Sequence, residues 1–322
     1  MKLGELRERQ SWSLEQKIDH SLGVIEQFYN TLNGRVYVSF SGGKDSTVLL
    51  WLARRIYPNI KACFCNTGNE YPDIVKFVRD KKTNGENIDI IYPEIKPQDI
   101  ISRFGFPLIS KETSHLLYDF RHKPYTVRAK KAMEEDTSKY NRVATKYRYL
   151  VTEPYDVSHL CCEYLKERPM HKYDLDNDLY PIVGTMACES KMRESAYLRM
   201  GQCNTFNNRD KRKQKSRPLS IWLEKDILDC IDRYNIPISE IYNKGMNRTG
   251  CAFCGFGVQF KEDTRLDFSF NEHPKLYQTF MNYENHGVKY RDAIRKVLEV
   301  NGKHLPDEKP ADLFCAPTNI IE

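Results

Sequence analysis

The chain has 322 residues, 40% of them hydrophobic and 29% charged, which is the composition of a globular enzyme with one large domain or two smaller ones. No run of about 18 apolar residues occurs, so no membrane span is predicted. The first residues are charged and lack the apolar core of a signal peptide, so we expect a cytoplasmic protein, in which clusters among its ten cysteines bind metal more often than they form disulfides.

Strands and helices are predicted to alternate over the first half of the chain. A helix with a Ser-x-x-Gln capping box is expected to begin at Ser13 and to end before Gly34. Apolar runs then predict strands at 35–40, 60–66, 88–94 and 180–185, with helices at 46–57, 72–82 and 97–105. This alternation predicts an α/β fold with a doubly wound, mostly parallel sheet that has helices on both faces.

The remaining segments indicate the domain organisation. Residues 110–160 interrupt the alternation and are expected to form a basic, partly helical insertion. After residue 218, polar helices are expected at 221–235, 273–283 and 289–300. The predicted divisions are an N-terminal helix at 1–34, an α/β domain at 35–217 and a helical C-terminal region with a cysteine cluster at 218–322.

A glycine-rich turn joins the first predicted strand to the helix that follows it. Backbone N–H groups converge at such a turn, and the helix dipole favours an anion there. Glycines let the chain approach a phosphate, and a lysine can neutralise its charge. The pattern is not the Walker loop G-x-x-x-x-G-K-[ST], and the alternative is a tight turn without a ligand. The residues expected to bind phosphate are Ser39, Ser41, Gly42, Gly43, Lys44, Asp45 and Ser46.

Four cysteines form a candidate metal site. Cys161 and Cys162 are adjacent, and Cys251 and Cys254 form a Cys-x-x-Cys pair. Four thiolates suit zinc or an iron–sulfur cluster. Two adjacent cysteines fit poorly on one Zn²⁺ ion, whereas a cubane offers separate iron corners, so a [4Fe–4S] cluster is favoured. The alternative is that these cysteines are small core residues.

Two basic stretches suit a polyanionic partner such as nucleic acid. Residues 121–150 hold nine Lys or Arg against three acids, and a second basic run covers 209–217. Tyrosines that could stack on bases interleave with the first stretch: Tyr125, Tyr140, Tyr147 and Tyr149. The alternative is an ordinary helical hairpin with a solvated charged face. Four histidines show no ligand spacing and are expected on the surface or in loops: His115, His122, His159 and His171.

The sequence Ser-Gly-Gly-Lys-Asp-Ser at 41–46 resembles the pyrophosphate-binding loop of the adenine-nucleotide alpha-hydrolase superfamily. Members with an intact loop cleave ATP between its α- and β-phosphates and adenylate a substrate. The resemblance implies binding of ATP with Mg²⁺, charge stabilisation by Lys44, and orientation of the loop or the metal by Asp45. By the same resemblance, Asn66, Thr67 and Gly68 line the nucleotide site, although the family often has Asp where Asn66 stands.

A Cys-Cys pair followed much later by Cys-x-x-Cys resembles the [4Fe–4S] signature of assimilatory adenylyl-sulfate reductases. The stretch 217–254 is similar to that family throughout. Residues 184–195 resemble its Gly-x-Arg-x-x-Glu-Ser segment, with Met186 where an Arg is usual, and imply a phosphate-binding role for Arg193. The phosphoadenylyl-sulfate reductase family in its broad sense thus covers roughly residues 35–260.

Two departures from the reductases shape the predicted function. The reductases have a degenerate loop without the lysine, and they end in a Glu-Cys-Gly-x-x-His tail whose cysteine attacks sulfate. This chain keeps Lys44, and its tail has a lone Cys315, a candidate sulfur nucleophile. An intact loop with a cluster resembles ATP-dependent sulfur-insertion enzymes, such as the sulfurtransferases of DNA phosphorothioation and the cluster-dependent tRNA thiolases.

The expected activity is therefore adenylation of an acceptor, which is expected to be nucleic acid, followed by sulfur transfer. A cysteine desulfurase is the expected sulfur donor, and a homo-oligomer is possible. One alternative is a reductase of adenylyl or phosphoadenylyl sulfate that releases sulfite. A second alternative is a non-catalytic nucleic-acid-binding protein on the same fold.

Overall fold

The computed structural model describes residues 1–134, 142–207, 210 and 213–308. The chain forms two compact units, each made of two segments. Unit 1 comprises residues 1–94 and 166–249, and unit 2 comprises residues 95–165 and 250–322. The predicted divisions at residues 34 and 217 stay a prediction, and unit 1 runs across both positions. Within the described ranges, no helix combines the length and the apolar character needed to cross a bilayer.

Unit 1 contains a six-stranded sheet with the strand order β3-β2-β1-β5-β7-β6. Neighbouring strands are parallel except for β6, which pairs antiparallel with β7 at the edge. The strands are β1 Val36–Ser39, β2 Ala62–Cys65, β3 Ile88–Ile91, β5 Tyr180–Val183, β6 Asn204–Thr205 and β7 Lys215–Ser216. The predicted doubly wound, mostly parallel sheet is confirmed.

Strand β1 lies at the centre of this sheet. Val38 is in register with Ala62 of β2 on one side and with Ile182 of β5 on the other, and all three side chains are fully buried. A parallel sheet is covered on both faces, so its central strands are apolar along their whole length. This burial explains why the strand read as a continuous apolar run in the sequence.

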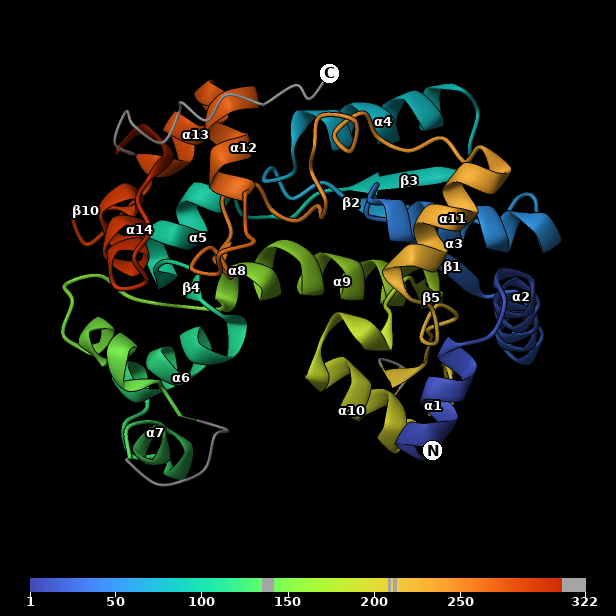
Figure 1. The fold of residues 1–322 in the computed structure, drawn as a ribbon, viewed down its shortest axis with the longest axis horizontal. Helices are drawn as coiled ribbons and strands as arrows, with labels where there is room; N and C mark the ends of the chain where they lie inside the picture. Colours follow the sequence, from blue (N-terminus) through green and yellow to red (C-terminus); the bar gives the residue numbers. More distant parts are fainter. Residues whose placement is uncertain (135–141, 208–209, 211–212, 309–322) are drawn as a thin grey trace, which may run out of the picture. The chain divides into compact units, whose positions relative to one another are not determined.

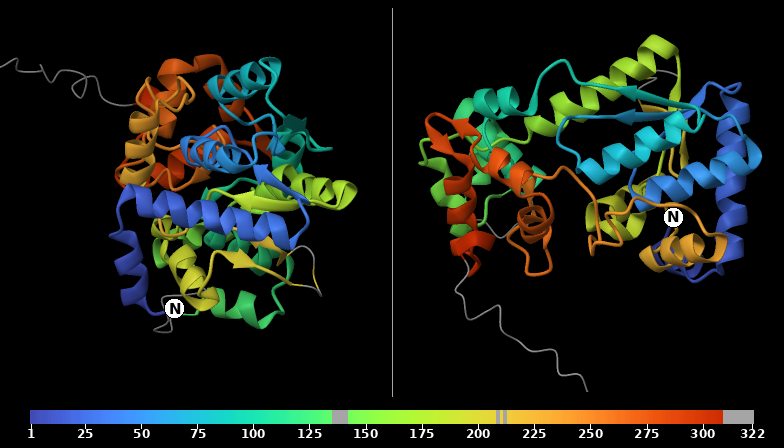
Figure 2. Two further views of the ribbon diagram at one scale, coloured as in Figure 1. Left: turned by 90° about the vertical axis from the view of Figure 1, so that its right-hand side faces the viewer. Right: turned by 90° about the horizontal axis from the view of Figure 1, so that it is seen from above.

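Helices cover both faces of the sheet. Helices α4 and α9 lie on opposite sides of β2 and β3 (Figures 1 and 2). The capping box predicted at Ser13 is present, because its side chain accepts from the Gln16 N–H and the Gln16 side chain accepts from the Ser13 N–H. The helices of unit 1 are α1 Leu3–Gln10, α2 Leu14–Thr31, α3 Lys44–Ile56, α4 Pro72–Thr83, α9 Arg168–Asn177, α10 Lys191–Met200 and α11 Glu224–Tyr234.

Unit 2 is mainly helical. Its helices are α5 Pro97–Phe104, α6 Lys111–His122, α7 Val127–Ala132, α8 Leu160–Cys162, α12 Arg265–Glu272, α13 Pro274–Met281 and α14 Tyr290–Glu299. It also has two small sheets that were not predicted, since strands of two residues show no periodicity. The parallel pair is β4 Leu108–Ile109 with β8 Gly255–Phe256, and the antiparallel pair is β9 Glu284–Asn285 with β10 Val288–Lys289.

Candidate functional site

The predicted phosphate loop, residues 41–46, connects the end of β1 to the start of α3. Gly42 has a φ of +72°, and a Cβ there would lie 2.8 Å from Cγ2 of Ile74. A Cβ on Gly43 would lie 2.7 Å from Oγ1 of Thr249. Gly43 is also the N-cap residue of α3, where no side chain caps the helix. The loop therefore places the open N-terminus of a 13-residue helix at the carboxyl edge of the sheet, a favourable position for an anion.

Two serines brace this loop. The Oγ atoms of Ser41 and Ser46 lie 3.0 Å apart, and the Ser41 N–H donates to Oγ of Ser46 at 3.1 Å. The hydroxyl of Ser46 donates to the carbonyl of Gly43 at 3.0 Å. Ser39 is the last residue of β1 and is half-buried in the sheet. The phosphate-binding role of these serines stays a prediction.

Lys44 is held as a cation at the first position of α3. Its side chain is only 7% exposed, and its Nζ lies 3.2 Å from Asp45 Oδ1 and 3.3 Å from Glu224 Oε1. Burial acts to lower the pKa of Lys44, but the carboxylates of Asp45 and Glu224 outweigh burial and keep the pKa above its ordinary value. The backbone N–H of Lys44 donates to the hydroxyl of Tyr242 at 2.8 Å. The loop thus offers a permanent positive charge close to the helix N-terminus.

Residues 66–70 follow β2, and β2 is the parallel neighbour of β1. The backbone N–H and the Oγ1 of Thr67 both donate to the Glu70 carboxylate at 2.8 Å, and the Gly68 N–H donates to Asn66 Oδ1 at 3.2 Å. A cavity of about 370 Å³ is lined by Asn66, Gly68, Glu70 and residues of α4, but not by residues of the phosphate loop. The second predicted segment is therefore at the expected edge of the sheet, and its nucleotide contacts stay a prediction.

Arg193 lies close enough to the phosphate loop for the charge of Asp45 to affect its pKa. Its guanidinium donates to the Glu189 carboxylate, which Arg248 also reaches at 3.3 Å. Burial lowers the pKa of Arg193 and the charge of Arg248 adds to this, whereas Asp45 and Cys188 oppose it. The phosphate-binding role of Arg193 stays a prediction.

Four residues of this region were missed in the sequence. Tyr242 and Glu224 bind Lys44, and Arg248 shares a carboxylate with Arg193. Cys188 donates to the Trp222 carbonyl at 3.3 Å, and burial raises the pKa of its thiol, with contributions from Glu224 and Asp45. These residues are at least 140 positions from the loop, so only the family segments that contain them could have identified them.

The four predicted metal ligands all belong to unit 2. Cys161 and Cys162 lie on α8, and the Cys254 N–H donates to the Cys251 carbonyl at 3.1 Å, which closes the turn before β8. A hydrogen bond to Cys162 and burial raise the pKa of Cys161 well above its ordinary value, and Cys254 and Cys251 add to the shift. Burial raises the pKa of Cys254 to about 12, with contributions from Cys251 and Cys162. The fold therefore brings the two pairs into one neighbourhood.

The two cysteine pairs supply four sulfur donors within unit 2. A tetrahedral zinc site needs its four sulfurs about 3.8 Å apart. Among the residues that the structure describes, no three or more His, Cys, Asp or Glu side chains are arranged to hold one metal ion. Four thiols in one neighbourhood are a donor set for zinc or for an iron–sulfur cluster, either of which binds them as thiolates. The metal role of these cysteines stays a prediction.

Close backbone packing fixes the Cys-x-x-Cys turn. Gly255 follows Cys254 directly and pairs with Leu108. A Cβ on Gly255 would lie 2.3 Å from the Pro107 carbonyl oxygen and 2.6 Å from the Tyr290 hydroxyl. That hydroxyl donates to the carbonyl of Phe253, inside the turn, at 2.7 Å. Only glycine fits here, so the position of the turn depends on segments far away in the sequence.

The segment of Cys161 and Cys162 is also anchored. Cys161 packs in a small core with Ile100 and Leu165. A π-helical turn, Glu163–Glu167, follows directly and leads into α9. Such wide turns are rare and are frequent at functional sites.

The remaining predicted site residues have different outcomes. Cys315 and Tyr140 lie outside the described residues, as do 209 and 211–212 of the second basic run. Tyr125 is 76% exposed, and its base-stacking role stays a prediction. The interpretation of Tyr147 was wrong, because this side chain is buried and its hydroxyl donates to Asn301 Oδ1 at 3.0 Å. Tyr149 is half-buried, with a buried hydroxyl.

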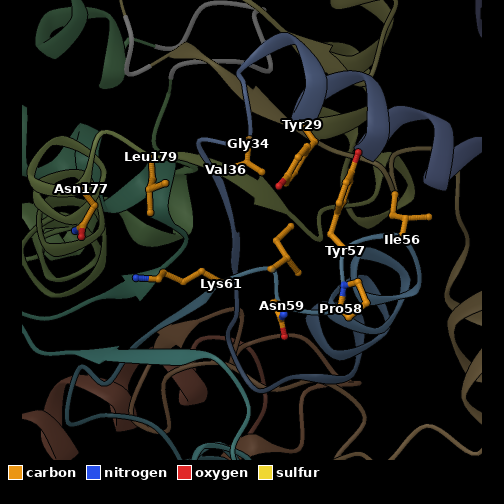
Figure 3. Close-up of a pocket in the computed structure, with 11 residues that line it drawn as sticks. Tyr29, Gly34, Val36, Ile56, Tyr57, Pro58, Asn59, Lys61, Asn177 and Leu179 are labelled. Carbon is orange, nitrogen blue, oxygen red and sulfur yellow. The ribbon is translucent and has the colours of Figure 1, made fainter.

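A cavity of about 510 Å³ lies at the opposite, amino ends of β1, β2 and β5 (Figure 3). The stacked rings of Tyr29 and Tyr57, with centroids 3.7 Å apart, contribute to its lining, together with Lys61 and Asn177. None of the predicted site residues lines it. Ligands of open α/β sheets bind at the carboxyl ends of the strands, so this cavity is separate from the candidate nucleotide site.

Several known proteins resemble this chain. Two uncharacterized proteins of Methanocaldococcus jannaschii are each 24% identical to it, over 267 and 247 residues. The similarity covers 82% and 75% of this chain but only 44% and 46% of theirs, so the chain spans less than half of their length. An adenosine 5′-phosphosulfate reductase of Lysinibacillus sphaericus is 20% identical over 245 residues, 76% of this chain and 83% of the reductase.

Two solved structures are similar in part. The phosphoadenylyl-sulfate reductase of Candida auris, in a phosphate complex, has a TM-score of 0.43 and 11% identity, covering 78% of this chain and 96% of that one. The U34-tRNA thiolase of Methanococcus maripaludis with its [4Fe–4S] cluster has a TM-score of 0.39 and 12% identity, covering 83% of this chain and 77% of that one.

The family model of the phosphoadenosine phosphosulfate reductase domain matches residues 35–110 and 108–255. The chain belongs to the phosphoadenosine phosphosulfate reductase domain family.

Proposed function

We propose that this protein is an ATP-dependent iron–sulfur enzyme that adenylates an acceptor and then replaces the activated oxygen with sulfur. The phosphate loop carries this proposal. Its lysine is kept charged beside the N-terminus of α3, and a pyrophosphate group needs both N–H donors and a cation. A sulfated mononucleotide has no β- and γ-phosphates, so a reductase would have no pyrophosphate for this loop to hold.

In the first step, an oxygen of the acceptor attacks the α-phosphorus of ATP. The bond from that phosphorus to the bridging oxygen breaks, and pyrophosphate leaves with the electron pair. Lys44 and the loop N–H groups would stabilise the charge that develops on the leaving group. Asp45, whose carboxylate contacts Lys44, would orient this lysine or bind Mg²⁺ with its oxygens.

In the second step, sulfur at the oxidation level of sulfide attacks the activated carbon. A carbon–sulfur bond forms, the carbon–oxygen bond breaks, and AMP leaves. A cysteine desulfurase together with a thiol reductant would supply this sulfur. Cys161, Cys162, Cys251 and Cys254 would hold a [4Fe–4S] cluster, which when bound would supply inorganic sulfide in unit 2. The basic stretch at 121–150 supports a nucleic acid as the acceptor.

Pyrophosphate release from ATP tests this proposal. The Lys44→Ala variant is expected to release pyrophosphate at least about 100-fold more slowly, because it removes the cation at the leaving group. The matched control is Lys172→Ala, which removes a 64%-exposed lysine of unit 1 that pairs with Glu94. Equal rates for Lys44→Ala and the control, or no binding of ATP to the wild-type chain, would overturn the proposal.

Sulfonucleotide reduction is a second candidate function. It is favoured by the similarity to adenosine 5′-phosphosulfate reductases of Lysinibacillus sphaericus, Staphylococcus haemolyticus and Halalkalibacterium halodurans at 20–21% identity. This candidate predicts release of sulfite from adenylyl or phosphoadenylyl sulfate in the presence of thioredoxin, with no requirement for ATP. Sulfite release without pyrophosphate release would decide for the reductase.

A further inference from the structure

Four aromatic rings of unit 2 form a continuous series that we name the ring platform: His115, Tyr118 and His122 of α6, and His159 just before α8. The spacing of three and four residues places the first three on one face of α6. His115 and His159 have ring centroids 4.0 Å apart, Tyr118 and His122 4.2 Å, and Tyr118 and His159 6.3 Å. The sequence predicted surface or loop positions for these histidines and gave no sign that the rings of His115 and His159 would lie side by side.

The ring platform is not part of the apolar core. The side chains of His115 and His122 are 34% and 42% exposed, and Tyr118 is half-buried. Leu116 and Leu117, between them in the sequence, are almost fully buried. Helix α6 thus directs its leucines into unit 2 and leaves the rings at the surface. Burial lowers the pKa of His115, helped by Arg128, so this ring is uncharged at neutral pH.

Cations surround the platform. The NH1 atom of Arg128 lies 3.4 Å from Nε2 of His115. The positive charges of Lys123 and Lys111 also lower the pKa of His115. Tyr125, which is 76% exposed, lies between the end of α6 and the start of α7 in the sequence.

The carboxylates near the ring platform already contact basic side chains. Asp119 lies 3.3 Å from His115, 3.9 Å from Lys123 and 4.0 Å from Arg128. Asp156 contacts His122 at 3.3 Å and also binds Arg121 and His286. Glu163 acts on His159. With these carboxylates already facing basic groups, the exposed lysines and Arg128 favour an anionic partner.

We propose that the ring platform stacks on unpaired bases of a nucleic-acid strand, while Lys111, Lys123 and Arg128 neutralise the neighbouring phosphates. Single-strand binding proteins combine these two elements, because every base has a face that can stack and every nucleotide has a charge. This inference rests on the proposed function, in which the acceptor is a nucleic acid. His159 directly precedes α8, so the strand would be held in the unit that contains the four cysteines.

The platform contacts bases and phosphates but has no defined group for the sugar. Unpaired RNA and DNA are therefore expected to bind with affinities within about threefold of each other, and a duplex, whose bases are already stacked, more weakly. The probes are fluorescein-labelled oligo-U and oligo-dT of twelve nucleotides and a hairpin duplex. Fluorescence anisotropy is measured with the full chain, without ATP or a sulfur donor, at about 50 and 200 mM salt.

Ring and charge variants separate the two contributions. Tyr118→Leu is expected to weaken binding about tenfold and to leave the salt dependence unchanged, whereas Tyr118→Phe keeps the ring and binds like the wild type. Lys123→Ala is expected to weaken binding less than Tyr118→Leu does, and to reduce the salt dependence of the affinity. The matched control is Tyr92→Leu, which removes a 59%-exposed ring of unit 1 and should have no effect.

The outcomes distinguish this inference from the proposed function. Wild-type affinity in Tyr118→Leu, equal losses in Tyr118→Leu and Tyr118→Phe, or tighter binding of an acidic peptide than of the oligonucleotides would overturn the inference. A chain that releases pyrophosphate but binds no oligonucleotide would overturn the platform alone. A chain that binds through the rings but never releases pyrophosphate would overturn the proposed function alone.

Discussion

The phosphate loop of unit 1 consists of six consecutive residues, whereas the cysteine set of unit 2 joins two segments separated by 89 positions. The loop takes its form from its neighbours along the chain, since β1 ends and α3 begins beside it. The cysteine turn takes its position from β4 and α14, which lie on either side of it in the sequence. A local motif can thus be interpreted directly, whereas a non-local one depends on the packing of the whole unit.

The largest expected effect comes from replacing one cysteine of the non-local motif, the cysteine set of unit 2. After anaerobic purification, Cys254→Ser is expected to lose most of the iron and sulfide of the wild type, because the variant removes one of the four predicted thiolate ligands. The rate of pyrophosphate release should not change, since the loop belongs to unit 1. Iron and sulfide counts with the visible spectrum measure this effect.

Cys188→Ser is the control, because Cys188 belongs to unit 1 and should leave the iron count unchanged. Zinc in place of iron in the wild-type chain would contradict the cluster and leave the ATP proposal intact.

The next effect is on stability. Gly255→Ala should reduce the free energy of unfolding by about 3 kcal/mol, because its Cβ would overlap the carbonyl of Pro107, which is backbone and cannot rotate away. Chemical denaturation monitored by circular dichroism measures this change. Gly250→Ala is the matched control, as no atom lies within 4 Å of its Cβ position. Equal stability of the two variants would show that the turn is not fixed by this packing.

A glycine-to-alanine substitution in the local motif, the phosphate loop, should affect activity more than stability. Gly43→Ala places a Cβ 2.7 Å from the Thr249 hydroxyl, which can move, so the unfolding free energy should change by less than about 1 kcal/mol. The displaced loop should release pyrophosphate about tenfold more slowly. Thr249→Ala added to Gly43→Ala should recover part of the rate, and no recovery would mean that this clash is not the cause.

The last effect concerns the pH dependence of stability. Burial acts to raise the pKa of Asp156, but hydrogen bonds from His286 and Arg121 outweigh it and hold the pKa below its ordinary value. A carboxyl with a lower pKa in the folded state stabilises the fold above its unfolded pKa of about 4, and this contribution is lost as the pH falls through the folded value. Asp156→Asn should therefore cost about 2 kcal/mol at pH 7 and progressively less below pH 4.

Thermal unfolding between pH 7 and pH 2 tests this dependence. The control is Asp80→Asn, which removes an exposed ion pair within one helix of unit 1 and should cost less than about 0.5 kcal/mol. A constant difference between Asp156→Asn and the wild type at every pH would assign the effect to packing rather than charge.

The aromatic residues of the basic stretch show where prediction from the sequence failed. Tyr147 lies among basic residues and was expected to stack on bases, yet it is buried against Asn301, 154 positions away. His159 showed no relation to the histidines of α6, yet its ring lies 4.0 Å from that of His115. Charge and spacing along the chain cannot decide which face of a short helix is covered, because the covering segments come from elsewhere in the sequence.

The order of residues along the chain was sufficient for the strands β1, β2, β3 and β5, for their parallel arrangement and for the glycine turn before α3. Each of these follows from hydrophobic periodicity and backbone sterics over a few adjacent residues. Tertiary packing alone placed Tyr242 and Glu224 on Lys44, joined the two cysteine pairs in one unit and aligned the four rings. These contacts close loops of 40 to 200 residues, and their geometry is set by the segments packed around them rather than by local preference.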